Sequence, residues 1–127
     1  KYDPSNPAFT VPQKLIDLHR SKDYGRYGTD GTLPVCFLSS LHTTGGNSGS
    51  PVLNGKGELI GINFDRTWES TMSDILFDPA KCRNISMDVR YVLFILDKYF
   101  GAQRLLDEIV LVAPTQVPHV IDLPVHR

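Results

Sequence analysis

The stretch Thr44-Gly45-Gly46-Asn47-Ser48-Gly49-Ser50-Pro51 decides how the rest of the chain is arranged. It places Ser48 between glycines and just ahead of an apolar segment. Glycine has no Cβ, so Gly46 and Gly49 let the backbone turn sharply on either side of the serine. A hydroxyl presented on such a turn can reach a carbonyl carbon and a general base, as a nucleophile must. We therefore predict that Ser48 is a nucleophile; the alternative is a Gly/Ser/Asn-rich turn without catalytic use.

The backbone of the same turn is a candidate oxyanion hole. The N–H groups of Gly46, Asn47 and Ser48 can converge on one point and hold the charge that develops on an attacked carbonyl. His42, six residues before Ser48, is a weak candidate for the general base. It would have to fold back over the oxyanion site to reach the hydroxyl.

The segment that follows the serine is predicted to be a β-hairpin. Apolar strands over 51–53 and 58–64 flank an Asn-Gly-Lys-Gly turn at 54–57. A hairpin centred there pairs residues whose numbers sum to about 112, with an error of about two residues. Ser48 then lies across from Phe64, and Asp65 and Arg66 lie beside the serine.

Asp65 and Arg66 are therefore candidate substrate-binding residues. The guanidinium of Arg66 can donate a forked pair of hydrogen bonds to a carboxylate of the substrate. Asp65 can attract a substrate cation such as a free amino terminus. The alternative is a solvated pair of opposite charges at the junction between a strand and a loop.

The remaining elements are predicted from apolar period and from Pro, Gly and capping residues. We expect an extended arm over 1–12, a helix over 13–23 that carries His19, a loop over 24–32, a strand over 33–40, a long loop over 67–83, a strand over 85–87, a helix from the N-cap Asp88 to Phe100, and a helix over 102–108.

Side chains outside the hairpin are expected to have structural roles. Cys36 is predicted to pack in the core, and spacing alone cannot decide whether it is bridged to Cys82. Trp68 is expected to pack in the core or to form a pocket wall. His119 and His126 lie in the last part of the chain and are expected to be incidental.

Composition is typical of one small globular domain, with 127 residues of which 41% are hydrophobic and 21% charged. The formal charge of −1 provides no electrostatic footprint for nucleic acid or an anionic membrane. No apolar run approaches the ~20 residues of a membrane span. Because the chain begins with a lysine, we expect it to start inside a longer protein.

Three stretches together resemble the carboxyl-terminal part of the bacterial dipeptidyl-peptidases of the seven and eleven types. They are Gly45-Gly46-Asn47-Ser48-Gly49-Ser50-Pro51, Phe64-Asp65-Arg66-x-Trp68-Glu69 and Ile85-x-Met87-Asp88-Val89-Arg90-Tyr91-Val92-Leu93. The resemblance covers residues 1 to about 111. It implies serine exopeptidases with a chymotrypsin-like double β-barrel and an inserted helical domain.

The resemblance implies a fold that is mainly β with carboxyl-terminal helices. Residues 1–111 would form part of the second barrel plus the terminal helices. Residues 112–127 do not resemble the family, and the prolines there predict an extended or disordered tail.

The resemblance also implies roles for individual residues. Ser48 matches the nucleophile, and the N–H groups of Gly46 and Ser48 match the oxyanion hole. Asp65 matches the acid that helps to hold the substrate's amino terminus. Arg66 matches the position that divides the family: the eleven type has arginine there and prefers Asp or Glu as the second substrate residue, whereas the seven type has glycine and takes apolar residues. No metal or organic cofactor is implied.

The catalytic histidine and aspartate of such enzymes belong to an amino-terminal part that this chain lacks. We therefore expect the chain alone to be inactive and the longer protein to act on peptides with a free amino terminus. The resemblance further implies a bacterial periplasm or cell surface, contact with the missing part of the same protein, and a homodimer. A glutamyl-endopeptidase-like enzyme and a non-catalytic module that binds acidic peptides are the alternative functions.

Overall fold

The computed structural model describes residues 2–112, so His119, His126 and nearly all of the predicted tail lie outside the described residues. In chain order the elements are the 3₁₀ helix η1 Pro7–Phe9, α1 Gln13–Ser21, the 3₁₀ helix η2 Gly25–Tyr27, β1 Cys36–Ser39, β2 Pro51–Leu53, β3 Leu59–Arg66, the 3₁₀ helix η3 Trp68–Asp74, β4 Asn84–Asp88, α2 Val89–Phe94, the π-helix η4 Ile95–Tyr99 and α3 Gln103–Asp107.

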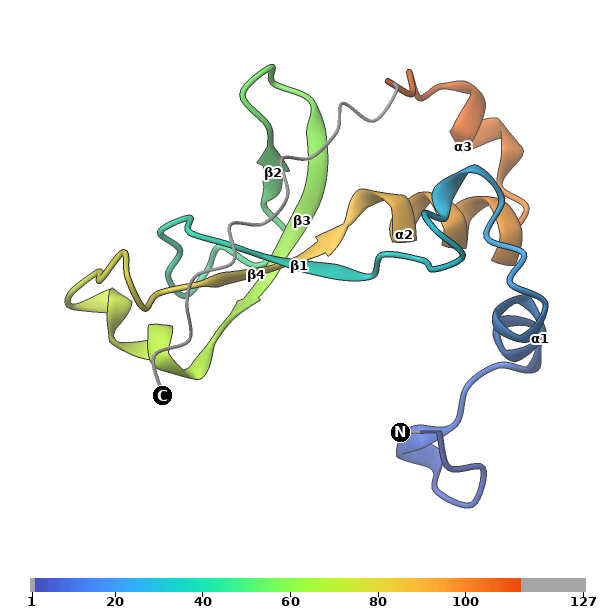
Figure 1. The fold of residues 1–127 in the computed structure, drawn as a ribbon, viewed down its shortest axis with the longest axis horizontal. Helices are drawn as coiled ribbons and strands as arrows, with labels where there is room; N and C mark the ends of the chain where they lie inside the picture. Colours follow the sequence, from blue (N-terminus) through green and yellow to red (C-terminus); the bar gives the residue numbers. More distant parts are fainter. Residues whose placement is uncertain (1, 113–127) are drawn as a thin grey trace.

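The strands form one antiparallel sheet of four in the order β1-β4-β3-β2 (Figure 1). Pro51 lies opposite Ile62 in the β2–β3 pair, and Phe37 lies opposite Ser86 in the β1–β4 pair. Gly61 is required at its position in β3, because a Cβ there would lie 2.7 Å from the Phe37 ring and 2.7 Å from a backbone oxygen of β4. A four-stranded sheet followed by helices confirms the predicted class, mainly β with carboxyl-terminal helices.

The three α-helices lie together at one end of the sheet, where the described hydrophobic core is found (Figure 1). Four buried residues form this core, namely Tyr24, Tyr27, Leu93 and Phe94. The Tyr27 hydroxyl donates to Asp97 Oδ2 at 3.0 Å and so ties the η2 loop to η4. Burial and this bond to a carboxylate raise the pKa of the tyrosine.

Strand β4 continues into α2 with no loop between them. Asp88 is the last residue of β4 and the N-cap of α2, and its side chain accepts from the Arg90 N–H. The same carboxylate forms an ion pair with the Arg90 guanidinium at 2.7 Å. Capping of this kind satisfies an orphan donor at the helix start, and the predicted N-cap is confirmed. Gly101, with φ +66°, follows the end of η4 as expected.

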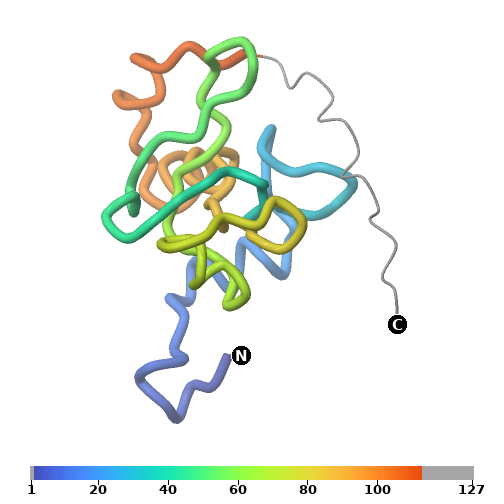
Figure 2. The backbone as a smooth tube through the Cα atoms, turned by 90° about the vertical axis from the view of Figure 1, so that its left-hand side faces the viewer, coloured from blue at the N-terminus to red at the C-terminus, as the bar shows by residue number. Residues whose placement is uncertain are grey.

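The amino-terminal arm contains η1 and runs away from the rest of the described chain, as Figure 2 shows. The helix predicted over 13–23 is confirmed as α1, and the strands predicted over 33–40 and 85–87 are confirmed as β1 and β4. None of the described helices combines the length and the apolarity that crossing a membrane demands.

Two sequence predictions are wrong for the described chain, and one of the two roles expected for Trp68 is excluded. Residues 67–83 contain η3 instead of being loop throughout. Trp68 at the start of η3 is 84% exposed, so it does not pack in a core; its alternative role as a pocket wall stays a prediction. Cys36 is exposed because strand alternation places it with Leu38 on a face that no described residue covers. Cys82 is buried, and both thiols are free, so the two cysteines are not bridged.

Candidate active site

A short turn sets the register that positions Ser48. The Asn54 side-chain oxygen accepts from the N–H groups of Lys56 and Glu58, at 2.9 and 3.0 Å. Gly57 has φ +79°, a conformation that favours glycine. Beyond the turn, Gly49 donates its N–H to the Asn63 carbonyl at 2.7 Å. The turn is thus built by contacts local in the chain, and the β2–β3 pairing shifts by one residue between Val52 and Leu53, within the error expected for the register.

The predicted position of Ser48 opposite Phe64 is confirmed. The Ser48 hydroxyl donates to the Phe64 carbonyl at 3.3 Å, and the serine is exposed. Pairing of β3 with β4 slips by one residue between Asn63 and Asp65, so Phe64 is bulged. Bulges re-aim the side chains that follow them and are frequent beside active sites.

The loop before Ser48 has its own internal hydrogen bonds. Thr44 N–H donates to Asn47 Oδ1 at 2.7 Å, and Asn47 N–H donates to the Thr44 carbonyl at 3.3 Å. Gly46 and Gly49 have φ values of +91° and +88°, so both positions require glycine.

These bonds leave two of the three candidate oxyanion donors without a described partner. The Asn47 N–H is engaged with Thr44, whereas the N–H groups of Gly46 and Ser48 have no hydrogen-bond partner within residues 2–112.

A buried polar network lies behind this loop, and the sequence analysis did not find it. Asn63 Nδ2 donates to the Asn47 carbonyl at 2.7 Å. Asn84, which is 0% exposed, donates to Asn63 Oδ1 and accepts from the hydroxyls of Ser86 and Ser39 at 2.6 and 3.1 Å. The signal that could have found it is the polar alternation of 84, 86 and 88, whose side chains are all buried in β4.

Replacing Asn84 by Ala should destabilise the protein by about 2–3 kcal/mol, because Asn63 Oδ1 and the serine hydroxyls lose a partner away from water. Denaturant unfolding of the whole protein should show a lower midpoint with an unchanged slope. The control is Asn6→Ala, whose exposed side chain accepts from the Ala8 N–H at 3.0 Å, so that its removal leaves no unpaired group away from water. Equal effects of the two changes would contradict a special contribution from the buried network.

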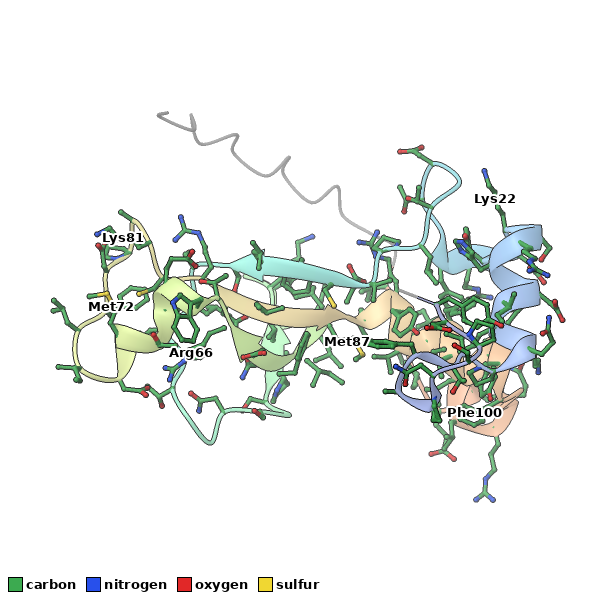
Figure 3. All side chains as sticks on the ribbon, turned by 90° about the horizontal axis from the view of Figure 1, so that it is seen from below. Lys22, Arg66, Met72, Lys81, Met87 and Phe100 are labelled. Carbon is green, nitrogen blue, oxygen red and sulfur yellow. The ribbon has the colours of Figure 1, made fainter. Side chains whose placement is uncertain are left out.

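Arg66 forms a bidentate ion pair with Asp74 of η3. Its Nη1 donates to Oδ1 at 2.6 Å and its Nη2 to Oδ2 at 2.7 Å. Nη1 also contacts the Ser73 hydroxyl at 3.1 Å and the Thr43 carbonyl at 3.4 Å. Figure 3 shows Arg66 at the end of the sheet opposite the helices. The hydrogen bonds to Asp74 raise the pKa of Arg66, and those from Arg66 lower the pKa of Asp74.

Ser48 and Arg66 line the same small cavity, which has a volume of about 100 Å³. Its walls are formed by Thr43, Thr44, Gly45, Ser48, Asn63, Phe64, Asp65 and Arg66. Asp65 also lines the cavity, and its Oδ1 accepts from the Arg66 N–H at 2.8 Å. The structure therefore brings together the predicted nucleophile and both predicted substrate-binding residues.

His42 has contacts that point away from a catalytic role. One ring nitrogen lies 3.1 Å from the Ser73 carbonyl, and the ring stacks on Phe77 with a centroid distance of 4.6 Å. No described side chain forms a hydrogen bond with the Ser48 hydroxyl, whose bond within residues 2–112 goes to a backbone carbonyl. Over the same residues, no three His, Cys, Asp or Glu side chains gather as metal ligands would.

Asp74 and Ser73 were missed because both lie in the stretch expected to be loop. Their contact with Arg66 depends on where η3 lies against β3, which no local pattern encodes.

The chain belongs to the Peptidase S46 family, whose model matches residues 1–111. It is 60% identical over 114 residues to the Asp/Glu-specific dipeptidyl-peptidase of Flavobacterium psychrophilum, covering 90% of this chain and 16% of that protein. It is 55% identical over 113 residues to dipeptidyl-peptidase 7 of Phocaeicola vulgatus, covering 88% of this chain and 16% of that protein.

A solved structure of Porphyromonas endodontalis DPP11 in complex with the dipeptide Arg-Asp matches with a TM-score of 0.82 at 55% identity. The match covers 86% of this chain and 16% of that one. The chain thus spans about 16% of the length of the relatives that it matches.

Proposed function

We propose that this chain carries the nucleophile and the acid-recognising arginine of a serine dipeptidyl-peptidase. The whole protein would release dipeptides whose second residue is Asp or Glu. The observation that carries the proposal is the cavity shared by Ser48 and Arg66. In it, one peptide can present its carbonyl to the hydroxyl and its acidic side chain to the guanidinium.

The described residues divide the work of acyl transfer. Ser48 Oγ attacks the carbonyl carbon, and the N–H groups of Gly46 and Ser48 hold the oxyanion. The leaving amine departs with a proton, and water then cleaves the acyl-enzyme ester. A general base has to take the serine proton. In this proposal the base is a histidine, oriented by an aspartate, from the part of the protein outside this chain.

Asp65 accounts for the exopeptidase character of the proposed reaction. Its carboxylate lines the same cavity and offers a negative charge to a free amino terminus. Relatives named Asp/Glu-specific dipeptidyl-peptidase, and DPP11 structures with the dipeptides Arg-Asp and Arg-Glu, support the acidic preference.

The fold, location and assembly of the whole protein are proposed from the same relatives. We propose that residues 1–111 form part of the second barrel of a chymotrypsin-like double barrel, completed by the missing amino-terminal part. A periplasmic or cell-surface location in a bacterium and a homodimer belong to the same proposal. No metal or organic cofactor is needed, because the reaction uses a hydroxyl, backbone donors and water.

The test uses peptide substrates whose second residue is Asp or Glu. It compares each substrate with a free amino terminus against the same substrate with a blocked one. The whole protein should cleave the free form at least about 100-fold faster, because blocking removes the cation that Asp65 attracts. The chain by itself should show no turnover, because it has no base for Ser48. Equal rates on blocked substrates would favour a glutamyl-endopeptidase-like enzyme, and turnover by the isolated chain would contradict the missing-base argument.

A non-catalytic module that binds acidic peptides is the competing class. A fluorophosphonate reacts with an activated serine, so labelling of Ser48 in the whole protein separates the two. An unlabelled protein that still binds acidic dipeptides would favour the module.

A further inference from the structure

Asp74 already occupies one edge of the guanidinium that is proposed to bind the substrate. The two Nη atoms each donate to one carboxylate oxygen, at 2.6 and 2.7 Å, in an end-on bidentate pair. A guanidinium carries five N–H donors. Nη1 has further acceptors in the Ser73 hydroxyl and the Thr43 carbonyl. Within residues 2–112 the guanidinium bonds are made by Nη1 and by one proton of Nη2, so the Nε–H and the second proton of Nη2 have no described acceptor.

Those two remaining protons lie on the same side edge of the planar group. An arginine can bind a carboxylate in bidentate fashion through either pair of parallel N–H groups. Arg66 can therefore hold Asp74 by its terminal edge and a second carboxylate by its side edge.

We infer that Asp74 is a positioning residue for acidic specificity. It holds Arg66 by the terminal edge so that the edge formed by Nε and Nη2 stays available to the acidic side chain of the substrate. The inference rests on the proposed function and adds a second residue to its recognition of Asp and Glu.

The surroundings of Asp74 indicate that it positions Arg66 and does not compete with the substrate for the edge formed by Nε and Nη2. Arg66 lines the cavity beside Ser48, and Asp74 is not among the described residues that line it. Asp74 instead belongs to a corner of η3 that is fixed to the segment leading to the serine. The hydroxyl of Ser73 donates to the Thr43 carbonyl at 3.2 Å, and His42 contacts the Ser73 carbonyl at 3.1 Å.

The two groups stay oppositely charged at neutral pH. The bonds between the two groups raise the pKa of Arg66 and lower that of Asp74, and the charges of Asp65 and His42 act in the same directions. Because Asp74 neutralises the guanidinium, discrimination between a carboxylate and an amide depends on the direction of the free edge. Discrimination between Asp and Asn is therefore the sensitive measurement.

The experiment uses the whole protein and a pair of substrates that share a free amino terminus and a leaving group. One substrate has Asp as its second residue and the other has Asn. Asp74→Asn should lower the ratio of kcat/KM for Asp over Asn by about tenfold, because the guanidinium loses its charged anchor.

Asp78→Asn is the matched control. Asp78 is also an acid of the segment between β3 and β4, but its contacts are with the Ala80 N–H and Lys81. Asparagine keeps the acceptor for Ala80, so the Asp/Asn ratio should stay at the wild-type value. Fluorophosphonate labelling of Ser48 reports whether each variant is folded. If Asp74→Asn fails to label, Asp74→Glu replaces it, since it keeps the charge and moves it by one methylene; an intermediate ratio is expected.

Each outcome is decisive. A wild-type protein that shows no preference for Asp overturns the proposed function and this inference together. If the wild type prefers Asp and the Asp74 variant has the same ratio of kcat/KM for Asp over Asn, the inference alone is overturned. A ratio above the wild-type value also overturns it, because Asp74 would then compete with the substrate for Arg66.

Discussion

Ser48→Ala should lower kcat/KM of the whole protein by at least about 10⁴-fold, because no other described group can form the acyl-enzyme. The hydroxyl is exposed and makes one described hydrogen bond, to the Phe64 carbonyl at 3.3 Å. Its removal should therefore leave the fold and the binding of acidic dipeptides intact. Steady-state kinetics and calorimetric binding of a product dipeptide measure the two effects separately.

Ser50→Ala is the matched control for this change. Ser50 lies in the same loop and is also exposed, and its described bonds are made by its backbone. It should retain nearly wild-type turnover. Similar losses in both variants would mean that the loop tolerates no change, and residual turnover in Ser48→Ala would show a different nucleophile.

Arg66→Gly should abolish the preference for Asp and Glu, lowering kcat/KM on those substrates by about 100-fold. The change removes the forked donor. It also leaves Asp74 without Arg66, the residue with which it forms an ion pair. Acidic side chains would then meet the negative charge of Asp65 in the cavity and that of Asp74 beside it, whereas apolar side chains would lose little. Kinetics on matched substrates with Glu and Leu as the second residue measure the ratio, and fluorophosphonate labelling of Ser48 shows that the loop is still formed.

Two further variants sharpen the assignment of Arg66. Arg66→Lys keeps the charge but not the fork, so it should recover only part of the preference. Arg104→Ala removes an arginine whose side chain is 94% exposed on α3, and the preference should not change. Survival of the preference for acidic substrates in Arg66→Gly would mean that Arg66 has a different role.

The part of the site that depends on contacts between neighbouring residues could be predicted from the sequence. The register that places Ser48 opposite Phe64 follows from the turn after Asn54, because the residues that set it are neighbours in the chain. The N-cap at Asp88 is local in the same way. Turns and N-caps can be predicted in this way because they depend on only a few consecutive residues.

The other half of the site depends on contacts between distant segments. Asn84 meets Asn63 only because β4 pairs with β3 after the chain has crossed η3. The pair of Arg66 with Asp74 likewise depends on how η3 turns back toward β3. The exposure of Trp68 had no local signal either, because an aromatic residue in a polar stretch is compatible with a core or with an uncovered surface.

Asp88 belongs at once to the sheet that carries the cavity and to the helix that enters the hydrophobic core. A hinge needs a few residues whose backbone angles can change freely, and this junction offers none, since its carboxylate is bound to the first helical turn. We expect the wall of the cavity and the helices to move as a single body. Any closing movement around a bound peptide would then have to come from the portion of the protein beyond this chain.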